Sequence, residues 1–355
     1  MAFFDIKPLI KEYNPQYSLV YGQRSNGKSW SVKELVMERF SKTGEKFIYI
    51  RRYDQDLKTK GAERYFGDFV AEGGLKKSTK GKYKDIKTYS GEFIAIPSDK
   101  EQQKEVCGWY IPLSTSGDRV KSQSFPGVTT IIFEEFLTHR LYLEDEFSLL
   151  QNLVSTIARN RLVNVIMIGN TVSRVCPYFP EFGIEDVTDM EQGTHKVYHQ
   201  FNQRGDCTDI LCIHTPEVEV KSDSGRSMFF GRPAKMILSG EWDIEDYPRR
   251  PKGEYETHYE IGFEFPQFNF IMQYQTAEET EQPILFIYPN KHDRKVDRVL
   301  TEDVSIDPMR SKCLRDDIRI EPMIRALWLQ GKVFYSDNLT GNDFNTSLLN
   351  SNIKL

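Results

Sequence analysis

The sequence predicts an α/β protein with a doubly wound, largely parallel sheet that carries an antiparallel insertion, followed by a smaller α+β domain. Up to residue 170, short apolar strands alternate with helical segments, which is typical of a sheet covered by helices on both faces. Beyond residue 251, several strands follow one another before a single helix. A chain of 355 residues is expected to form two or three domains at about 150 residues each. We predict domains at 1–205 and 251–355, joined by a linker region at 206–250.

The first domain is expected to open with a strand, a loop, a helix and a second strand. Residues 17–21 (YSLVY) form a short apolar run, and a helical pattern continues from Lys28 to Phe40 before it stops near Gly44. Residues 46–52 (KFIYIRR) predict the second strand.

The alternating pattern then resumes after the insertion. Between about 73 and 116 the apolar period drops to two, which predicts short antiparallel strands. Residues 129–136 (TTIIFEEF) predict a buried strand ending in acids, 144–161 an amphipathic helix, and 164–170 (NVIMIGN) another buried strand. In the second domain we expect a strand meander and a helix at 322–332.

The composition excludes several classes of protein. Hydrophobic residues make up 39% and aromatic residues 13% of the chain, which is enough to build cores and argues against a disordered protein. No apolar run approaches a membrane span, and Asp5 and Lys7 interrupt any signal-peptide core. Five cysteines without a C-x-x-C pair indicate a reducing compartment. We therefore expect an unexported chain with no membrane partner.

A complete phosphate-binding motif, G-x-x-x-x-G-K-[ST], lies between the first predicted strand and helix, the context that this motif requires. The glycines let backbone N–H groups curl around a β-phosphate, Lys28 can reach the β and γ oxygens, and the Ser29 hydroxyl can ligate Mg²⁺. The motif predicts ATP and Mg²⁺ as cofactors, bound by Gly22, Gln23, Arg24, Ser25, Asn26, Gly27, Lys28 and Ser29.

Two acids at the end of the strand 129–136 supply what such a site needs next. Glu134 takes the metal-side position, and Glu135 is the predicted base that activates the attacking water. The metal-side acid is usually Asp, so Glu134 carries an additional methylene. Asn170, which ends the next buried strand, could orient the water or sense the γ-phosphate, although a plain turn asparagine explains the residue equally well.

The net charge of −5 gives no general attraction to nucleic acid, so any polyanion site has to be local. The segment 76–87 (KKSTKGKYKDIK) holds six lysines against one aspartate. On a strand, Lys80, Lys82 and Lys84 would present three ammonium groups on one face. They are candidates for contacts with a phosphate backbone, and a solvated lysine hairpin is the alternative.

Two further patterns are interpreted as structural. The string N-K-x-D at 290–293 matches a guanine-recognition motif, but it lies far beyond the phosphate-binding loop and across a predicted domain boundary. The residues His195, His199, Cys207, Cys212 and His214 could hold zinc. However, their C-x4-C spacing is at the edge of the usual range, and Ile210 and Leu211 predict a strand there.

Several strings together resemble the DNA-packaging motor ATPases of small podoviruses, the Picovirinae-type phages with protein-primed genomes. The matching strings cover most of residues 15–180 in order: GQRSNGKS (22–29), FIYIRRY (47–53), GWYIPLS (108–114), IIFEEF (131–136), ARNR (158–161) and NTVSRVCPYF (170–179). The resemblance implies an additional-strand, catalytic-glutamate (ASCE) P-loop ATPase domain. It also implies ATP-driven translocation of double-stranded DNA into a procapsid in the host cytoplasm.

The resemblance further implies a ring, a homopentamer at the portal vertex, that contacts the portal protein and a structural packaging RNA. It places an arginine finger that acts on the neighbouring subunit's ATP at Arg159. Arg24, by its position inside the phosphate-binding loop, is a rival for this role within the same chain. Lys121 matches a cationic position that serves DNA or a neighbouring subunit. The C-terminal domain would be a decayed RNase H-like nuclease. Because no metal-binding carboxylate cluster can be assigned there, we predict no nuclease activity.

Two other functions fit the same residues. An ASCE helicase would prefer single strands and stack bases on aromatic side chains. A nucleotide-gated assembly switch would bind ATP without motor activity.

Overall fold

The computed structural model describes residues 3–58, 61–120, 123–159, 161–218, 230–292, 294–296, 298–304, 309–314 and 320–355. The chain forms two compact units. The first comprises the chain up to Thr138, Tyr142–Val172 and Glu181–Trp242, and the second comprises His139–Leu141, Ser173–Pro180 and Asp243–Leu355. The first unit thus reaches well into the segment 206–250 that we predicted to be a linker.

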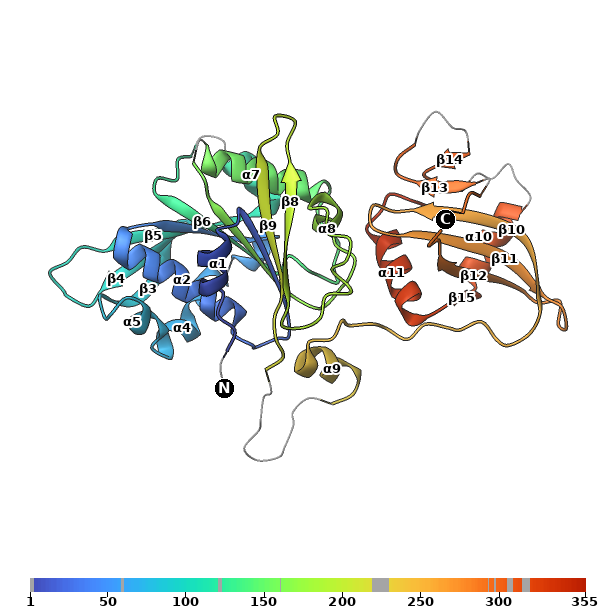
Figure 1. Cartoon of the computed structure of the whole chain (residues 1–355), viewed down its shortest axis with the longest axis horizontal. Helices are drawn as coiled ribbons and strands as arrows, with labels where there is room; N and C mark the ends of the chain where they lie inside the picture. Colours follow the sequence, from blue (N-terminus) through green and yellow to red (C-terminus); the bar gives the residue numbers. More distant parts are fainter. Residues whose placement is uncertain are drawn as a thin grey trace. The chain divides into compact units, whose positions relative to one another are not determined.

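The first unit is built on one nine-stranded sheet (Figure 1). Its order is β3-β4-β5-β2-β6-β7-β1-β9-β8. The strands are β1 (Tyr17–Gly22), β2 (Lys46–Arg51), β3 (Tyr83–Tyr89), β4 (Glu92–Pro97), β5 (Glu105–Pro112), β6 (Val128–Glu134), β7 (Asn164–Asn170), β8 (His195–Phe201) and β9 (Cys207–His214).

Six neighbouring strands, from β5 to β9 in the sheet order, pair in parallel, while β3, β4 and β8 extend the two edges in antiparallel pairing. The predicted α/β class with a largely parallel sheet and an antiparallel insertion is confirmed. One detail differs, because β5 of the insertion also pairs in parallel with β2. The predicted boundary at residue 205 falls between β8 and β9, and β9 pairs in parallel with β1, the strand that leads into the phosphate-binding loop.

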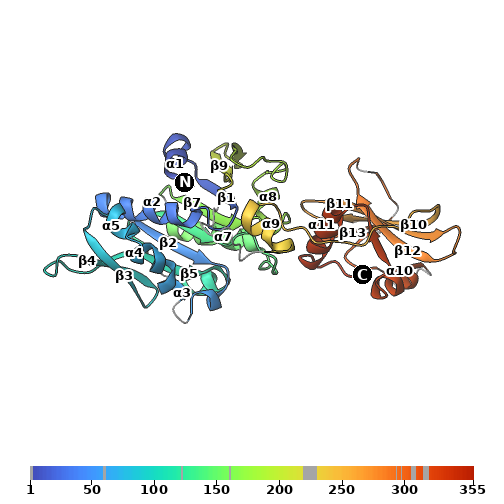
Figure 2. The same ribbon diagram turned by 90° about the horizontal axis from the view of Figure 1, so that it is seen from below.

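Helices cover both faces of this sheet (Figure 2). Apolar residues of α1 (Lys7–Tyr13), α2 (Lys28–Thr43) and α5 (Gly74–Ser78) form one core cluster with alternate residues of the strands. Helix α7 (Glu146–Ala158) packs against β6 and buries Leu150, Leu153 and Ile157 outside that cluster. The shorter helices of this unit are α3 (Gly61–Tyr65), α4 (Gly67–Ala71), α6 (Ser116–Arg119) and α9 (Arg232–Ser239), and α8 (Tyr178–Glu181) spans the boundary between the units.

The lysine-rich segment 76–87 joins the strand β3 only from Tyr83 onward, so it does not place three lysines on one strand face. Lys80 and Gly81 both have positive φ, 50° and 78°, and make the turn that leads from α5 into β3. Of the three lysines predicted to alternate on one face, Lys84 alone lies within β3. The common face expected for the three lysines is not formed, because Gly81, placed between them, supports a left-handed turn at that point.

The second unit holds a six-stranded sheet of order β14-β13-β10-β11-β12-β15. The strands β10 (Tyr255–Glu264), β11 (Asn269–Ala277) and β12 (Pro283–Pro289) form the expected antiparallel meander, and β13 (Val299–Thr301), β14 (Arg310–Ser311) and β15 (Val333–Tyr335) add in parallel. Helices α10 (Ile320–Leu329) and α11 (Asn338–Leu349) contribute apolar residues to its core.

All five cysteines are free. Within the described residues, no helix is both long and apolar enough to cross a membrane.

Candidate nucleotide-binding site

The strand order brings the predicted site residues to one edge of the first sheet. Strand β7 lies between β1 and β6, so the phosphate-binding loop and the acids are separated by one strand. In the parallel register Gly22 pairs with Asn170, and Glu134 pairs with Ile168. Because parallel strands end at the same edge, three chain segments far apart in sequence meet there.

The phosphate-binding loop between β1 and α2 depends on two glycines with positive φ. Gly22 and Gly27 have φ of 142° and 99°, values that L side chains rarely adopt. A Cβ on Gly22 would also lie 2.2 Å from Thr215 Oγ1. The same hydroxyl accepts a hydrogen bond of 2.6 Å from the Asn26 amide. Thr215, which follows β9, is therefore a structural partner of the loop that the sequence motif did not reveal.

Lys28 is buried in this loop and points at backbone carbonyls. Its ammonium donates to the carbonyls of Gly22, at 3.1 Å, and Gln23, and to Asn26 Oδ1 at 3.2 Å. Burial lowers the pKa of Lys28 to about 7, although the Glu134 carboxylate partly opposes this shift. A bound phosphate would give the Lys28 ammonium an anionic partner. Helix α2 begins at Lys28, so the positive end of its dipole would favour the same phosphate.

The two acids have different surroundings. Glu134 ends β6 with a side chain only 14% exposed, and Tyr49 donates a hydrogen bond to its Oε2 at 3.2 Å. Its other oxygen, Oε1, is buried without a hydrogen-bond partner among the described residues. Glu135 is 60% exposed and accepts a hydrogen bond of 2.6 Å from Arg51. Because buried polar atoms are normally paired, Glu134 Oε1 fits a ligand to a cation or to the water molecules around one.

The backbone at Glu135 is held by a buried ion pair. Glu135 has a φ of 60°, and its carbonyl accepts a hydrogen bond of 2.9 Å from Arg52. Arg52 also donates to the carbonyl of Phe136 and makes two hydrogen bonds to Glu146 of α7. The sequence FIYIRR gives a hint of this ion pair, because arginines at the end of a buried strand need acceptors or acids as partners.

A cavity of about 680 Å³ opens at this edge. It brings together most of the predicted site residues, namely Arg24, Ser25, Asn26, Gly27, Lys28, Ser29, Glu134, Glu135 and Asn170, and adds Phe3, Trp30, Asp68 and Glu72. Gln23 is not part of the lining, because its amide side chain exchanges hydrogen bonds with the backbone of Val218. Its contribution to phosphate binding would come from its backbone.

Arg159 and Arg161 do not lie on a helix as predicted. Helix α7 ends at Ala158, and Arg159 leaves it with φ 50° and ψ −105°. Both side chains then reach the same segment: Arg159 donates to the carbonyl of Gln123 at 3.1 Å, and Arg161 donates to that of Phe125 at 3.0 Å. The helix predicted at 144–161 therefore ends before both arginines. Arg159 is exposed and is not among the described residues that line the nucleotide cavity.

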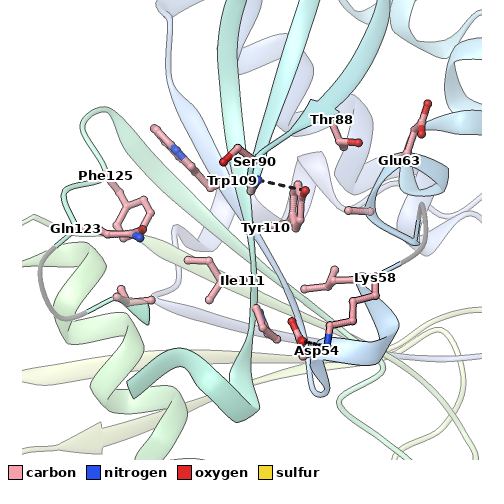
Figure 3. A pocket seen from close by; sticks show the side chains of 15 residues that line it. Asp54, Lys58, Glu63, Thr88, Ser90, Trp109, Tyr110, Ile111, Gln123 and Phe125 are labelled. Carbon is pink, nitrogen blue, oxygen red and sulfur yellow. Dashed lines mark hydrogen bonds and ion pairs between the residues drawn. The ribbon is translucent and has the colours of Figure 1, made fainter. Parts of the chain in front are cut away.

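The segment that both arginines bind also forms the wall of a second cavity, of about 550 Å³ (Figure 3). Its lining includes Trp109, Tyr110, Gln123 and Phe125, and Trp109 packs edge-on against Phe125. Lys121, a predicted contact residue, lies outside the described residues, two positions before Gln123.

Comparison with known proteins places this chain in a family. The model of the Podovirus DNA encapsidation protein (Gp16) family matches residues 3–203. The chain belongs to this family. The DNA packaging protein of Bacillus phage phi29 is 33% identical over 247 residues, and that of Bacillus phage B103 is 32% identical over 238. Each match covers 66% of this chain, and the chain spans only 65% and 64% of the length of these two relatives.

Solved structures extend the likeness of fold to both units. A chain of the bacteriophage phi29 genome packaging motor assembly superposes with a TM-score of 0.60 and 22% identity over 98% of this chain and 100% of its own length. A chain of a second motor, the Phi-28 gp11 DNA packaging motor, gives a TM-score of 0.52 and 16% identity, covering 98% of each chain.

Proposed function

We propose that this protein is the ATPase subunit of a viral genome-packaging motor, which couples ATP hydrolysis to the translocation of double-stranded DNA into a procapsid. The proposal rests on family membership together with the residues that meet at the nucleotide cavity. The chain belongs to a DNA encapsidation family, and the cavity at its sheet edge joins a phosphate-binding loop to two acids and an asparagine from neighbouring strands. The strand between β1 and β6 supports the ASCE class.

The residues of the cavity support a division of roles in hydrolysis. The loop N–H groups and Lys28 would bind the β- and γ-phosphates. Ser29 and the buried Glu134 would hold Mg²⁺, which neutralises charge on the phosphate oxygens when bound. Glu135 would take a proton from the attacking water, and Asn170, one strand away beside Gly22, would orient that water. Because Arg51 binds the Glu135 carboxylate, this contact has to loosen before Glu135 can act as a base.

Arg159 is proposed to complete the site of a neighbouring subunit. It lies outside the cavity of its own chain, and among the described residues its guanidinium has a backbone carbonyl rather than a carboxylate as partner. A cation with an uncompensated charge at the surface suits a transition state whose charge spreads over the γ-phosphoryl oxygens. Arg24, which lines the cavity, remains the rival within the chain.

The proposed assembly is a homopentameric ring at the portal vertex in the host cytoplasm, in contact with the portal protein and a structural packaging RNA. The likeness of fold to chains of the phi29 genome packaging motor assembly and of the Phi-28 gp11 packaging motor supports assembly of this kind. For DNA, the candidates are Lys80, Lys82 and Lys84, now placed on a turn and the start of β3, and Lys121.

The second unit is proposed to be an RNase H-like domain that has lost its nuclease activity. Its order β12-β11-β10-β13-β14, with three antiparallel strands extended by two parallel ones, supports that fold. Two of the three glutamates of its strand β10 are paired with arginines, because Arg294 binds Glu260 and Arg310 binds Glu264. A two-metal nuclease needs such carboxylates for cations instead.

The decisive experiment measures ATP hydrolysis with and without duplex DNA, together with the mass of the oligomer. A packaging motor is expected to form a ring and to be accelerated by duplex DNA. Equal rates with and without DNA would favour the nucleotide-gated switch, and stimulation by single strands alone would favour the helicase. Either outcome would overturn the proposal.

A further inference from the structure

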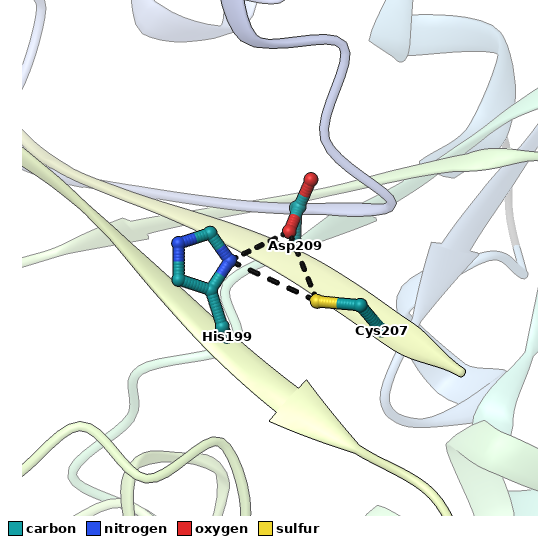
Figure 4. A group of neighbouring side chains, drawn as sticks. All are labelled: His199, Cys207 and Asp209. Carbon is teal, nitrogen blue, oxygen red and sulfur yellow. Dashed lines mark hydrogen bonds and ion pairs between the residues drawn. The ribbon is translucent and has the colours of Figure 1, made fainter. Parts of the chain in front are cut away.

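The hairpin of β8 and β9 carries a cluster of three side chains that the ATPase site does not use. His199, Cys207 and Asp209 present their donor atoms within 4.8 Å of one another (Figure 4). His199 Nδ1 lies 2.7 Å from Asp209 Oδ1, and Cys207 Sγ lies 3.4 Å from that oxygen and 3.8 Å from His199 Nδ1. The side chains are exposed or half-buried, so solvent ions can reach them.

Strand register produces this cluster. His199 is paired directly with Asp209 across the antiparallel ladder, which places their Cβ atoms about 4.5–5.5 Å apart. Cys207 precedes Asp209 by two residues and therefore shares its face of the sheet. Cys212 and His214 lie an odd number of residues from Asp209 along β9, so they are on the other face of the sheet, and both are buried. Cys212 and His214 therefore belong to the buried interior, whereas His199 and Cys207 are exposed.

We propose that His199, Cys207 and Asp209 form a binding site for one zinc ion or a similar thiophilic divalent cation. Tetrahedral zinc with ordinary bond lengths to sulfur, nitrogen and oxygen separates its ligand atoms by about 3.3–3.6 Å. The three separations of 2.7, 3.4 and 3.8 Å lie on both sides of that range. The shortest, between His199 and Asp209, has to lengthen by only about 0.6 Å to fit zinc. The fourth position is left to a water molecule.

The donor set determines which metals the site selects. A thiolate with an imidazole and one carboxylate favours zinc over Mg²⁺, which prefers oxygen ligands alone. When the metal binds, the Cys207 thiol gives its proton to solvent and forms the sulfur–metal bond, without any change of oxidation state. The ion would join β9 to β8, the edge strand of the sheet, close to the tip of their hairpin.

The test is titration of the full chain with zinc sulfate in a reducing buffer that contains excess Mg²⁺, which keeps the nucleotide site occupied. We expect one strong site per chain, and with cobalt(II) a thiolate-to-metal charge-transfer absorption. Cys207→Ser should remove that absorption and weaken zinc binding at least a hundredfold, since even loss of residues around metal ligands costs about 10- to 100-fold. His199→Asn and Asp209→Asn should also weaken binding.

Matched controls separate this site from incidental thiol binding. Cys313 is an exposed cysteine in the second unit, and His195 lies four residues before His199 on the same face of β8. Cys313→Ser and His195→Asn should both bind zinc like the unmodified chain. Zinc binding of unchanged strength in Cys207→Ser, or loss of binding in Cys313→Ser, would overturn the proposal. All variants are expected to keep their ATPase rate, so the result does not depend on the proposed motor function.

Discussion

The acids of the two sheets differ in how their charges are balanced. On β10 of the second unit, Glu260 and Glu264 each bind an arginine of the same unit. At the edge of the first sheet, Glu134 keeps one buried oxygen without a hydrogen-bond partner in the described part of the chain, beside a lysine whose ammonium is destabilised by burial. On β10 each of these two acids has an arginine of its own, whereas Glu134 and Glu135 share Arg51, at 3.9 Å and 2.6 Å, so a metal and a phosphate would complete the charge balance of this edge. Incomplete charge balance therefore marks the reactive site more clearly than the presence of acids does.

The largest expected effect concerns Arg159, which in contrast to Arg294 and Arg310 has no carboxylate partner among the described residues. Arg159→Ala should lower ATP turnover by about 10³- to 10⁵-fold, the usual contribution of an arginine finger. Rings mixed from Arg159→Ala and Glu135→Gln subunits, each nearly inactive alone, should regain hydrolysis, because an Arg159→Ala site borrows a finger from its neighbour. Proven mixed rings as inactive as their parents would contradict action between subunits, and Arg24→Ala then becomes the next variant to measure.

A second prediction separates the two neighbouring acids. Glu135→Gln should bind ATP normally yet hydrolyse it about 10²- to 10⁴-fold more slowly, because the attacking water loses its base. Glu134→Gln should instead raise the Mg²⁺ concentration needed for half-maximal activity. Single-turnover hydrolysis across a Mg²⁺ titration measures both. Near-normal turnover in Glu135→Gln together with loss in Glu134→Gln would reverse the two roles.

A third prediction uses the lowered pKa of Lys28. In the free site the pKa of Lys28 is about 7, so above pH 7 the side chain is mostly a neutral amine, whereas bound phosphate favours the ammonium and raises the pKa. Binding then takes up a proton, and ATP affinity should fall by up to about tenfold per pH unit above 7. Calorimetry on Glu135→Gln at pH 8, in two buffers that differ in ionisation enthalpy, measures the uptake. Binding without proton uptake would show that Lys28 is already charged in the free site.

A fourth prediction tests the salt slope of DNA binding. Each lysine that contacts a phosphate should add about 0.9 to the slope of log affinity against log salt concentration. A triple alanine variant at Lys80, Lys82 and Lys84 should therefore lower the slope. An unchanged slope in a filter-binding series would assign these lysines to solvent.

The smallest effects are expected on β10. Glu264→Gln removes a partly exposed ion pair with Arg310, which should cost less than about 1 kcal/mol of stability. ATP turnover should stay unchanged, and supercoiled DNA should remain uncut by both the original chain and the variant when Mg²⁺ or Mn²⁺ is present. Metal-dependent cleavage that disappears in Glu264→Gln would show that the second unit is an active nuclease after all.

The sequence by itself determined the elements of the first sheet and the phosphate-binding loop. Apolar runs such as 17–21, 164–170 and the part of 129–136 before Glu134 are stable when buried, and the phosphate-binding motif has a fixed spacing, so both are encoded locally. The position of Gly22 and Asn170 at the same edge of the sheet was also within reach, because parallel strands end at a common edge.

The tertiary structure alone decided contacts between residues distant in the chain. Thr215 against Gly22, and Arg52 beneath Glu135, depend on which strands become neighbours, and no local pattern encodes that choice. The gathering of His199 with Cys207 and Asp209 depends on a register in which a shift of one residue would turn one strand's side chains to the other face. The turn at Lys80 and the end of α7 before Arg159 depend on residues with positive φ, and the spacing of apolar residues in the sequence does not reveal such conformations.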